Sequence, residues 1–560
     1  MKVLIRPAAL VVISLVAALR LGAQAPAPTA PAAVLEPDFP VATVTLVDLD
    51  DDGRREMLVV GRAGEIRVHR LGADGKLAAR EGWALPHPER SLLALARLEG
   101  PDSPLHLVVA DPDGARAHAW SSEKGLAEEG RRLARRARFD IRGGRPVFAD
   151  FVRDVNADGR ADLVIPDARH VELWLATAEG FRRTAQVEVR TRISAEYEAE
   201  GNRDFLSQGI VVPDLEMMDV NGDGRPDLVV SRRESTGFHI QTADGAIPVA
   251  PDVTLELDRF RDTSEKATVR PGYTLAGTER AKSLIRDLDG DGIPDYLVAH
   301  RRKVWIFHGT KEGPQFTKPT EIMKTADEMT GIWLARLDDD EDVDLLIVRV
   351  QVPSIAGIIG GLLGSFEIDF TATGYANLDG KRFEKSPSWR RDLTFKLPSI
   401  TEILRNPEAI IQRFEEAGRK FRRTLRGDFD GDGREDVGLV AEDGAKLEVF
   451  FARADDPPPA AETLDDVMRE VFFEDDDDVW DLDRMVDWLG SLGARQAARL
   501  TAGRSADRSL ALPTPAETPL RQALEADLDG RPGREIVLVY SRALREDADL
   551  ARIEVHRITR

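Results

Sequence analysis

Five short segments place carboxylate or amide side chains at the first, third, fifth and ninth positions of the pattern D-x-[DN]-x-D-G-x-x-[DE]. Alternate residues of a tight loop point toward a common centre, and Ca²⁺ takes about six to eight oxygen ligands in such loops. Without a cation, three or four converging carboxylates would repel one another. We therefore predict about five Ca²⁺ sites, one per loop, and name each loop after its first residue. The predicted ligands are Asp48, Asp50, Asp52 and Glu56; Asp154, Asn156, Asp158 and Asp162; Asp219, Asn221, Asp223 and Asp227; Asp287, Asp289, Asp291 and Asp295; and Asp428, Asp430, Asp432 and Asp436.

Glycine occupies the sixth position of every loop, where it permits a sharp turn. EF-hands share the opening of this pattern, but they need a bidentate glutamate at the twelfth position, between two helices. The twelfth positions here are aliphatic and lie in predicted strands, which excludes EF-hands. They are Val59, Ile165, Val230, Val298 and Leu439.

Three further segments occupy equivalent places in the chain but depart from the pattern. A guanidinium can neutralise neighbouring carboxylates through charge-assisted hydrogen bonds. In two of these segments an arginine either replaces the metal in this way or points into solvent. The segments hold Arg97, Glu99, Pro101 and Leu105; Arg336 with Asp338, Asp340 and Asp344; and Asp527, Asp529 and Glu535 with Arg531 at the fifth position.

Each segment lies between a short apolar stretch and an aliphatic run, and this unit recurs eight times. Runs of four or five β-favouring residues bounded by turn residues predict buried strands. A further strand follows each run, and the repeat of about 40–50 residues with insertions is typical of propeller blades. The aliphatic runs begin at Glu56, Leu105, Asp162, Asp227, Asp295, Asp344, Asp436 and Glu535.

We therefore predict an all-β fold, a β-propeller of eight blades, with seven as the alternative count, over residues 41–560. The segment from Val34 to Pro40 is expected to pair with the last unit and close the ring. Two helical insertions are predicted, at about 398–420 and 463–500, and each opens with a capping box. The apolar stretch at 355–364 either packs under the neighbouring helix or docks a partner.

The first 23 residues have the order of a secretory signal, with Lys2 and Arg6 ahead of an apolar run that is too short for an ordinary membrane span. Residues 24–40 are an Ala/Pro-rich linker. We expect an exported protein, which is periplasmic, cell-surface or secreted, with no transmembrane span in the mature chain. An uncleaved anchor is the alternative. The chain has no cysteine, so disulfides do not stabilise it.

The units at Asp219 (DVNGDGRPDLVVS) and Asp287 (DLDGDGIPDYLVA) resemble the FG-GAP/VCBS repeat family, which includes the propellers of integrin α-subunits. The resemblance covers about residues 41–560. It implies a ring of blades with one calcium ion in each intact inter-strand loop. It says little about activity, because the family includes adhesion proteins, lectins and domains attached to enzymes.

Composition and motifs point away from catalysis and from nucleic acids. A net charge of −22, with no basic stripe, excludes a nucleic-acid partner. The chain has no G-x-S-x-G, H-E-x-x-H, P-loop or Rossmann motif. We therefore predict no enzyme but a binding or structural module for an unknown glycan or protein.

The alternative function is a polysaccharide-active enzyme that resembles rhamnogalacturonan lyases with a propeller fold. Trp480 and Trp488, on the second insertion, are candidates either for recognition or for packing in a helix core. His69, His118, His239, His308 and His556 lie in or beside predicted third strands, where a place in the strand core or on the strand surface is expected.

Overall fold

The computed structural model describes residues 30–558, except 73, 80–81, 122, 136–143, 167–169, 189, 199–202, 212–213, 262–269, 278, 337–341, 355, 358–364, 379, 454–477, 502, 514–517 and 543–548. Several predictions therefore lie outside the described residues. They are the signal segment, the linker up to residue 29, Asp338 and Asp340, nearly all of the apolar stretch at 355–364, and the start of the second insertion.

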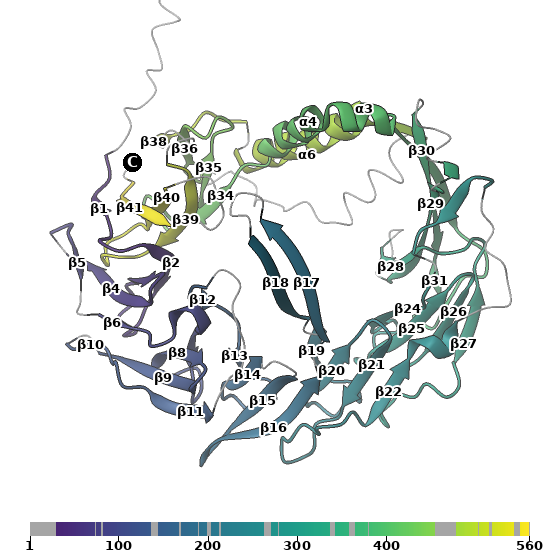
Figure 1. Ribbon diagram of the computed structural model, residues 1–560, viewed down its shortest axis with the longest axis horizontal. Coiled ribbons are helices and arrows are strands. Elements are labelled where there is room, and N and C mark those ends of the chain that lie inside the picture. Colours follow the sequence, from purple (N-terminus) through teal and green to yellow (C-terminus); the bar gives the residue numbers. More distant parts are fainter. Residues whose placement is uncertain are drawn as a thin grey trace, which may run out of the picture.

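Antiparallel sheets follow one another around a ring, as Figure 1 shows. Each predicted aliphatic run forms a buried strand, and each predicted following strand pairs with it. The predicted all-β class is confirmed, and the arrangement fits a β-propeller.

The sheets between the two ends of the chain are small and each is built from neighbouring segments. Four of them have four strands, and within each of these the strands run in sequence order. In chain order the strands are β7 (Leu92–Arg97), β8 (Leu105–Asp111), β9 (Gly114–Ser121), β10 (Gly125–Leu126), β11 (Arg131–Arg135) and β12 (Val147–Phe148); β13 (Val152–Arg153), β14 (Asp162–Pro166), β15 (His170–Thr177) and β16 (Gly180–Glu188); β19 (Asp214–Met218), β20 (Asp227–Ser231), β21 (Ser235–His239) and β22 (Val253–Glu256); β24 (Lys282–Arg286), β25 (Asp295–His300), β26 (Lys303–Phe307) and β27 (Glu321–Lys324); β23 (Tyr273–Leu275), β28 (Gly331–Ala335), β29 (Asp344–Pro353), β30 (Phe366–Tyr375), β33 (Trp389–Leu397) and β37 (Val479–Asp481); and β34 (Thr424–Gly427), β35 (Asp436–Val440), β36 (Lys446–Phe450) and β38 (Arg508–Ala511).

One larger sheet, the closing sheet, joins the two ends of the described chain. The N-terminal strand β1 pairs antiparallel with the last strand β41, with Ala33 opposite Val555 and Leu35 opposite Ile553. Val41 at the start of β2 also pairs with Leu550. This pairing is what a closing strand requires. The strands are β1 (Ala33–Leu35), β2 (Val41–Val47), β3 (Glu56–Gly61), β4 (Glu65–Leu71), β5 (Leu77–Ala79), β6 (Trp83–Ala84), β39 (Leu520–Ala526), β40 (Glu535–Ser541) and β41 (Leu550–His556).

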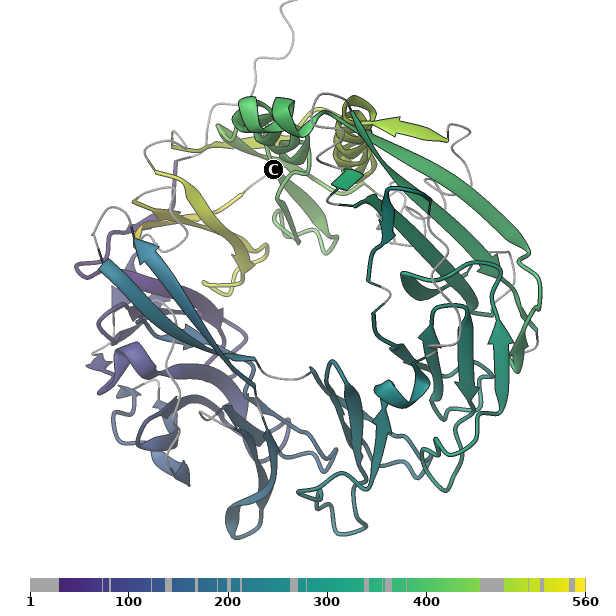
Figure 2. The ribbon, with the colours of Figure 1, turned by 45° about the vertical axis from the view of Figure 1, so that its right-hand side comes forward.

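Two hairpins stand apart from these sheets. One, β17 (Arg190–Glu198) with β18 (Arg203–Val211), was not predicted, and it lengthens the interval between loops 154 and 219. It crosses the ring in Figure 1 and stands off one face of it in Figure 2. The other is the short pair β31 (Asn377–Leu378) and β32 (Arg382–Phe383).

The helical insertions differ in detail from the prediction. The first is two helices, α3 (Ile400–Arg405) and α4 (Pro407–Arg419), because the proline after Asn406 cannot continue a hydrogen-bonded helix. Ser399 caps α3 as predicted and accepts the Glu402 N–H. Two 3-10 turns also occur, at Pro88–Arg90 and Leu257–Phe260. In the second insertion α6 spans Leu482–Thr501, and the residues before it form the strand β37.

Apolar clusters fill the spaces between neighbouring sheets. One cluster packs Leu58 and Val60 of β3 against Leu93 and Leu107 of the next sheet. The helices lie between the sheets of β30 and β35 (Figure 1), and there the buried side chains of β35 and β36 pack against α6. The second strands of the repeat therefore form the core that holds each acidic loop in place.

Candidate metal-binding loops

The five predicted loops share one backbone conformation, which the sixth-position glycine permits. Each of these glycines has a φ between +82° and +85°, a region that other residues rarely adopt. The glycine N–H donates to an oxygen of the first aspartate at 2.7–2.9 Å. The first aspartate is thus turned inward by the loop's own backbone. The glycines are Gly53, Gly159, Gly224, Gly292 and Gly433.

The ninth carboxylate anchors each loop to the strands beneath it. It is at most 1% exposed in every predicted loop. One of its oxygens accepts the N–H of the second loop residue at 2.8–3.0 Å. In the four loops that end in aspartate, the other carboxylate oxygen accepts a second backbone N–H at 2.7–2.8 Å. The donor is the residue that directly follows the third-strand residue opposite the aspartate. The donors are Ala176, Gln241, Gly309 and Ala452.

Burial makes four of these anchoring carboxylates hard to ionise without a cation, those of Glu56, Asp162, Asp227 and Asp436. Desolvation, with a smaller contribution from the neighbouring Asp158 and Asp154 carboxylates, raises the pKa of Asp162 to about 7. Desolvation likewise raises the pKa of Asp227 and of Asp436. A divalent ion in the loop would favour the ionised form, because an opposite charge nearby lowers the pKa of a carboxyl.

The structure brings acidic oxygens together in three of the five predicted loops. In each of these, oxygens from three carboxylates lie within 4.8 Å of one another. The sets are Asp48, Asp50 and Glu56; Asp287, Asp289 and Asp291; and Asp428, Asp430 and Asp436.

Asparagine stands at the third position of the other two loops. The amides of Asn156 and Asn221 donate to the fifth-position aspartates at 3.3 and 3.0 Å. In both loops the fifth aspartate also accepts the N–H two residues further on, at 2.9 Å. Hard oxygen donors around a sharp turn are the donor set that Ca²⁺ prefers. Among the described residues, no lysine or arginine pairs with a predicted ligand of loops 154 or 287, although His308 Nδ1 lies 3.1 Å from Asp295 Oδ1 in loop 287.

The three irregular segments differ from one another. In the first, Arg97 pairs with Asp51 of loop 48, with one contact at 3.0 Å, so this segment docks onto the neighbouring loop. In the second, Asp344 is buried and accepts the Asn377 N–H at 2.8 Å, as the ninth residue does elsewhere. The third departs from the pattern at its fifth position, yet its carboxylates form a group as compact as the others. They belong to Asp527, Asp529 and Glu535.

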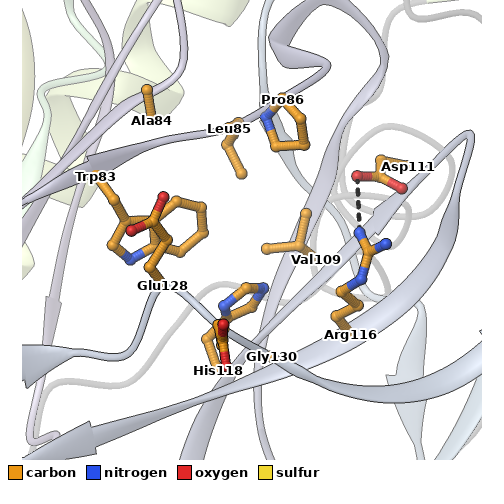
Figure 3. Close-up of a pocket in the computed structure, with 11 residues that line it drawn as sticks. Trp83, Ala84, Leu85, Pro86, Val109, Asp111, Arg116, His118, Glu128 and Gly130 are labelled. Atoms are coloured by element: carbon orange, nitrogen blue, oxygen red, sulfur yellow. Dashed lines mark ion pairs between the residues drawn. The ribbon is translucent and has the colours of Figure 1, made fainter.

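A separate pocket of about 410 Å³ lies between the closing sheet and the next sheet. Figure 3 shows the rings of Trp83 and His118 on one side of it and the Asp111–Arg116 pair on the other. The two rings stack with centroids 4.7 Å apart, and the ion pair measures 3.6 Å. Trp83 Nε1 is buried and has no hydrogen-bond partner in the described part of the chain. Glu128 adds a carboxylate at the edge, so the pocket combines aromatic surface with polar groups.

Four of the five histidines named in or beside third strands are buried, which agrees with the expected place in the strand core. They are His69, His118, His239 and His556. Burial lowers the pKa of His69, His118 and His239. His118 donates from Nδ1 to the Ala127 carbonyl at 3.0 Å, and His239 does the same to the Pro248 carbonyl at 2.9 Å. Each ring is therefore held neutral within its sheet.

Acidification should test this burial. The unfolded chain takes up protons near pH 6.5, whereas His239 in the folded protein stays neutral to lower pH. Its contribution to stability is therefore fully present above about pH 6.5 and is lost as the pH falls through the lower folded-state pKa. We expect the stability gap between the native protein and His239→Gln, measured by urea unfolding, to narrow from about pH 7.5 to about pH 5.5. A gap of constant size would contradict this. The half-exposed His87, replaced in the same way, is the control.

Of the two tryptophans of the second insertion, Trp480 is buried and Trp488 is partly buried beside it. Trp480 is 2% exposed on β37, and its ring lies 5.6 Å from that of Trp488 and 6.0 Å from that of Phe395. Of the two alternatives, recognition does not hold for Trp480, because the parallel pairing of β37 with β33 buries it. Core packing, the other expectation, is confirmed for it.

Comparisons with known proteins agree with the repeat. Residues 287–347, which begin at loop 287, match the family model described as FG-GAP-like repeat. The resemblance seen in the sequence is thereby confirmed. No curated protein matches the chain at a significant level. No helix within the described ranges is long and apolar enough to cross a membrane.

Two solved structures are similar at low identity. One is an Agrocybe aegerita lectin that recognises non-reducing terminal N-acetylglucosamine, with 13% identity and a TM-score of 0.26, covering 63% of this chain and 80% of that chain. The other is BBS1N in complex with ARL6DN, with 12% identity and a TM-score of 0.18, covering 57% of this chain and 91% of that chain. At these TM-scores neither likeness bears on function.

Proposed function

We propose that this chain, which carries an FG-GAP-like repeat at residues 287–347, is an exported calcium-binding β-propeller of eight blades. It acts as a binding or structural module for a glycan or protein partner and catalyses no reaction. Calcium ions in the repeated acidic loops stabilise the blades.

The observation that carries this proposal is the common construction of the acidic loops. Each holds its first carboxylate inward with a glycine N–H and ties its ninth carboxylate to the core strands. A cation bound between these groups would connect the loop to two strands of its blade. Bound calcium would therefore stabilise the folded ring and fix the loops at its surface. The signal-like order of residues 1–23 supports export, where calcium is abundant.

The pocket beside Trp83 is the place at which we expect a small glycan to bind. Aromatic rings supply apolar contact area, and polar groups around them supply orientation. The buried Trp83 Nε1 lacks a partner among the described residues, and Asp111, Arg116 and Glu128 offer further donors and acceptors. A sugar presents both hydroxyl groups and apolar C–H faces, which suits this combination.

A glycan array with and without chelator would identify a ligand, and Trp83→Ala would locate its site. We expect this variant to bind the identified glycan about tenfold more weakly, which is roughly 1–2 kcal/mol, because it removes the aromatic surface. Trp333→Ala, which removes an exposed tryptophan from a different sheet, is the matched control and should bind normally. Equal affinity of Trp83→Ala and the native protein would place the ligand elsewhere.

An assay on pectic polysaccharides separates the module from the alternative enzyme. We expect calcium-dependent capture without release of shortened or unsaturated products. Product formation that persists in purified protein would favour a polysaccharide-active enzyme.

A further inference from the structure

Arg70, on β4, reaches into loop 48 from the side. Its Nη2 lies 2.7 Å from Asp50 Oδ2, 3.3 Å from Asp52 Oδ2 and 2.5 Å from Glu56 Oε1, and its Nε donates to the same glutamate at 2.7 Å. One guanidinium therefore contacts three of the four carboxylates that the pattern assigns to calcium. Asp48 Oδ1 and Asp50 Oδ1 are buried with no hydrogen-bond partner among the described residues.

Arg557, directly after β41, contacts two carboxylates of the third irregular segment, which we call loop 527 after its first residue. Its Nη1 pairs with Asp529 and lies 3.4 Å from Glu535 Oε1, and its Nη2 donates to the Pro532 carbonyl at 3.3 Å. Arg531, the residue predicted to take this place, is 57% exposed and lies 3.7 Å from Asp529. A guanidinium does enter the group, but it comes from the third strand instead of from the loop.

The two arginines occupy one and the same position in their sheets. Strand register puts Arg70 opposite Glu56 and Arg557 opposite Glu535, one step beyond the last ladder pairs. Among the five predicted loops and loop 527, only loops 48 and 527 end in glutamate. The extra methylene of glutamate carries the carboxylate toward the guanidinium. In the four loops that end in aspartate, the third-strand residue opposite that aspartate is Leu175, Ile240, His308 or Phe451. The backbone N–H of the residue after it donates to the aspartate.

We propose that Arg70 and Arg557 are built-in cations that replace calcium in loops 48 and 527. This rests on the proposed function, because it takes calcium binding by the aspartate-closed loops as given, and it restricts calcium to loops 154, 219, 287 and 428. Calcium bound at about 2.3–2.6 Å to the oxygens that Arg70 contacts would lie within about 5 Å of Nη2, where the two positive charges repel. The guanidinium instead satisfies these oxygens with charge-assisted hydrogen bonds.

Both arginine-closed loops belong to the closing sheet, which contains the first and last strands of the described chain. The junction of the ring is therefore held by permanent charge pairs, whereas the other acidic loops depend on a metal supplied by the surroundings. We expect the closing sheet to keep its loop conformations when calcium is removed.

Native mass spectrometry of the full chain in calcium tests the proposal by counting ions. We expect one ion for each aspartate-closed loop, four in all. Arg70→Leu introduces leucine, which is also the residue at the equivalent position opposite loop 154, Leu175. We expect this variant to bind a fifth calcium ion. Arg557→Leu should likewise gain one. Arg67→Leu, from the same strand, removes an arginine that pairs with Asp38 outside the loop, and it should keep the native count.

The outcomes distinguish the two proposals. No bound calcium in the native protein would refute the proposed function itself. Five or six ions in the native protein would leave that function standing and overturn the built-in cations. An unchanged count in both arginine variants, with normal circular dichroism, would also overturn them. If one of the two arginine variants fails to fold in chelator but folds in calcium, a calcium ion bound in the altered loop replaces the lost guanidinium. That outcome supports the proposal.

Discussion

Transfer from about 1 mM calcium into chelator is expected to lower the melting temperature of this protein by roughly 2–5 °C. Extracellular calcium modules bind with dissociation constants of about 10⁻⁴–10⁻³ M, so each occupied loop adds about 0.4–1.4 kcal/mol at this concentration. The four aspartate-closed loops together would then supply about 2–6 kcal/mol. Differential scanning calorimetry measures the change.

Variants can assign this shift to the loops. One triple variant combines Asp287→Asn, Asp289→Asn and Asp291→Asn. Loop 287 then keeps its size but loses the three carboxylates whose oxygens lie together. We expect the calcium-dependent part of the melting temperature to shrink by about a quarter. Magnesium, which demands stricter geometry and dehydrates reluctantly, should stabilise less than calcium at equal concentration. A native protein that melts at one temperature in both calcium and chelator would contradict calcium binding.

Replacement of Asp436 by alanine is expected to destabilise the fold by about 3–5 kcal/mol even in chelator. The side chain is fully buried and accepts the backbone N–H groups of Phe429 at 2.8 Å, Asp430 at 3.3 Å and Ala452 at 2.8 Å. Alanine leaves these buried donors unsatisfied, and each such donor costs about 1–3 kcal/mol. Urea unfolding in chelator isolates this loss from any effect of metal.

A surface aspartate in the next turn supplies the control. Asp443 is exposed and accepts the Ala445 N–H at 2.9 Å, so Asp443→Ala should change stability by only about 0.5 kcal/mol. If Asp436→Ala were no less stable than this control in chelator, the ninth carboxylate would act through metal alone. A loss that grows further in calcium would show both roles, as anchor and as ligand.

Local patterns predicted the parts of the fold that depend on neighbouring residues. Aliphatic runs such as that at Asp295 become buried strands because burial follows from their composition. The turn at Gly292 follows from its loop pattern, and the Ser399 cap follows from a serine three residues before a glutamate. These features are decided within a few residues of sequence.

Contacts between distant segments could not be predicted from local sequence patterns. The position of Arg557 beside Asp529 depends on strand register, and the pairing of β37 with β33 buries Trp480 far from any local cue. A comparison of third-strand residues across units could have found the arginines, because each accompanies a glutamate at the ninth position. The hairpin of β17 and β18 was missed because the repeat itself gave no reason to expect strands between its units.

The pairing of Ala33 with Val555 gives this fold a high contact order and delays its completion. During synthesis β1 emerges early, whereas its partner strand β41 emerges late. Until then β1 and the edge of β2 lack their partner, and unpaired edges invite association with other chains. Slow ring closure, and protection of the early segments by chaperones, are the folding behaviour to expect from this topology.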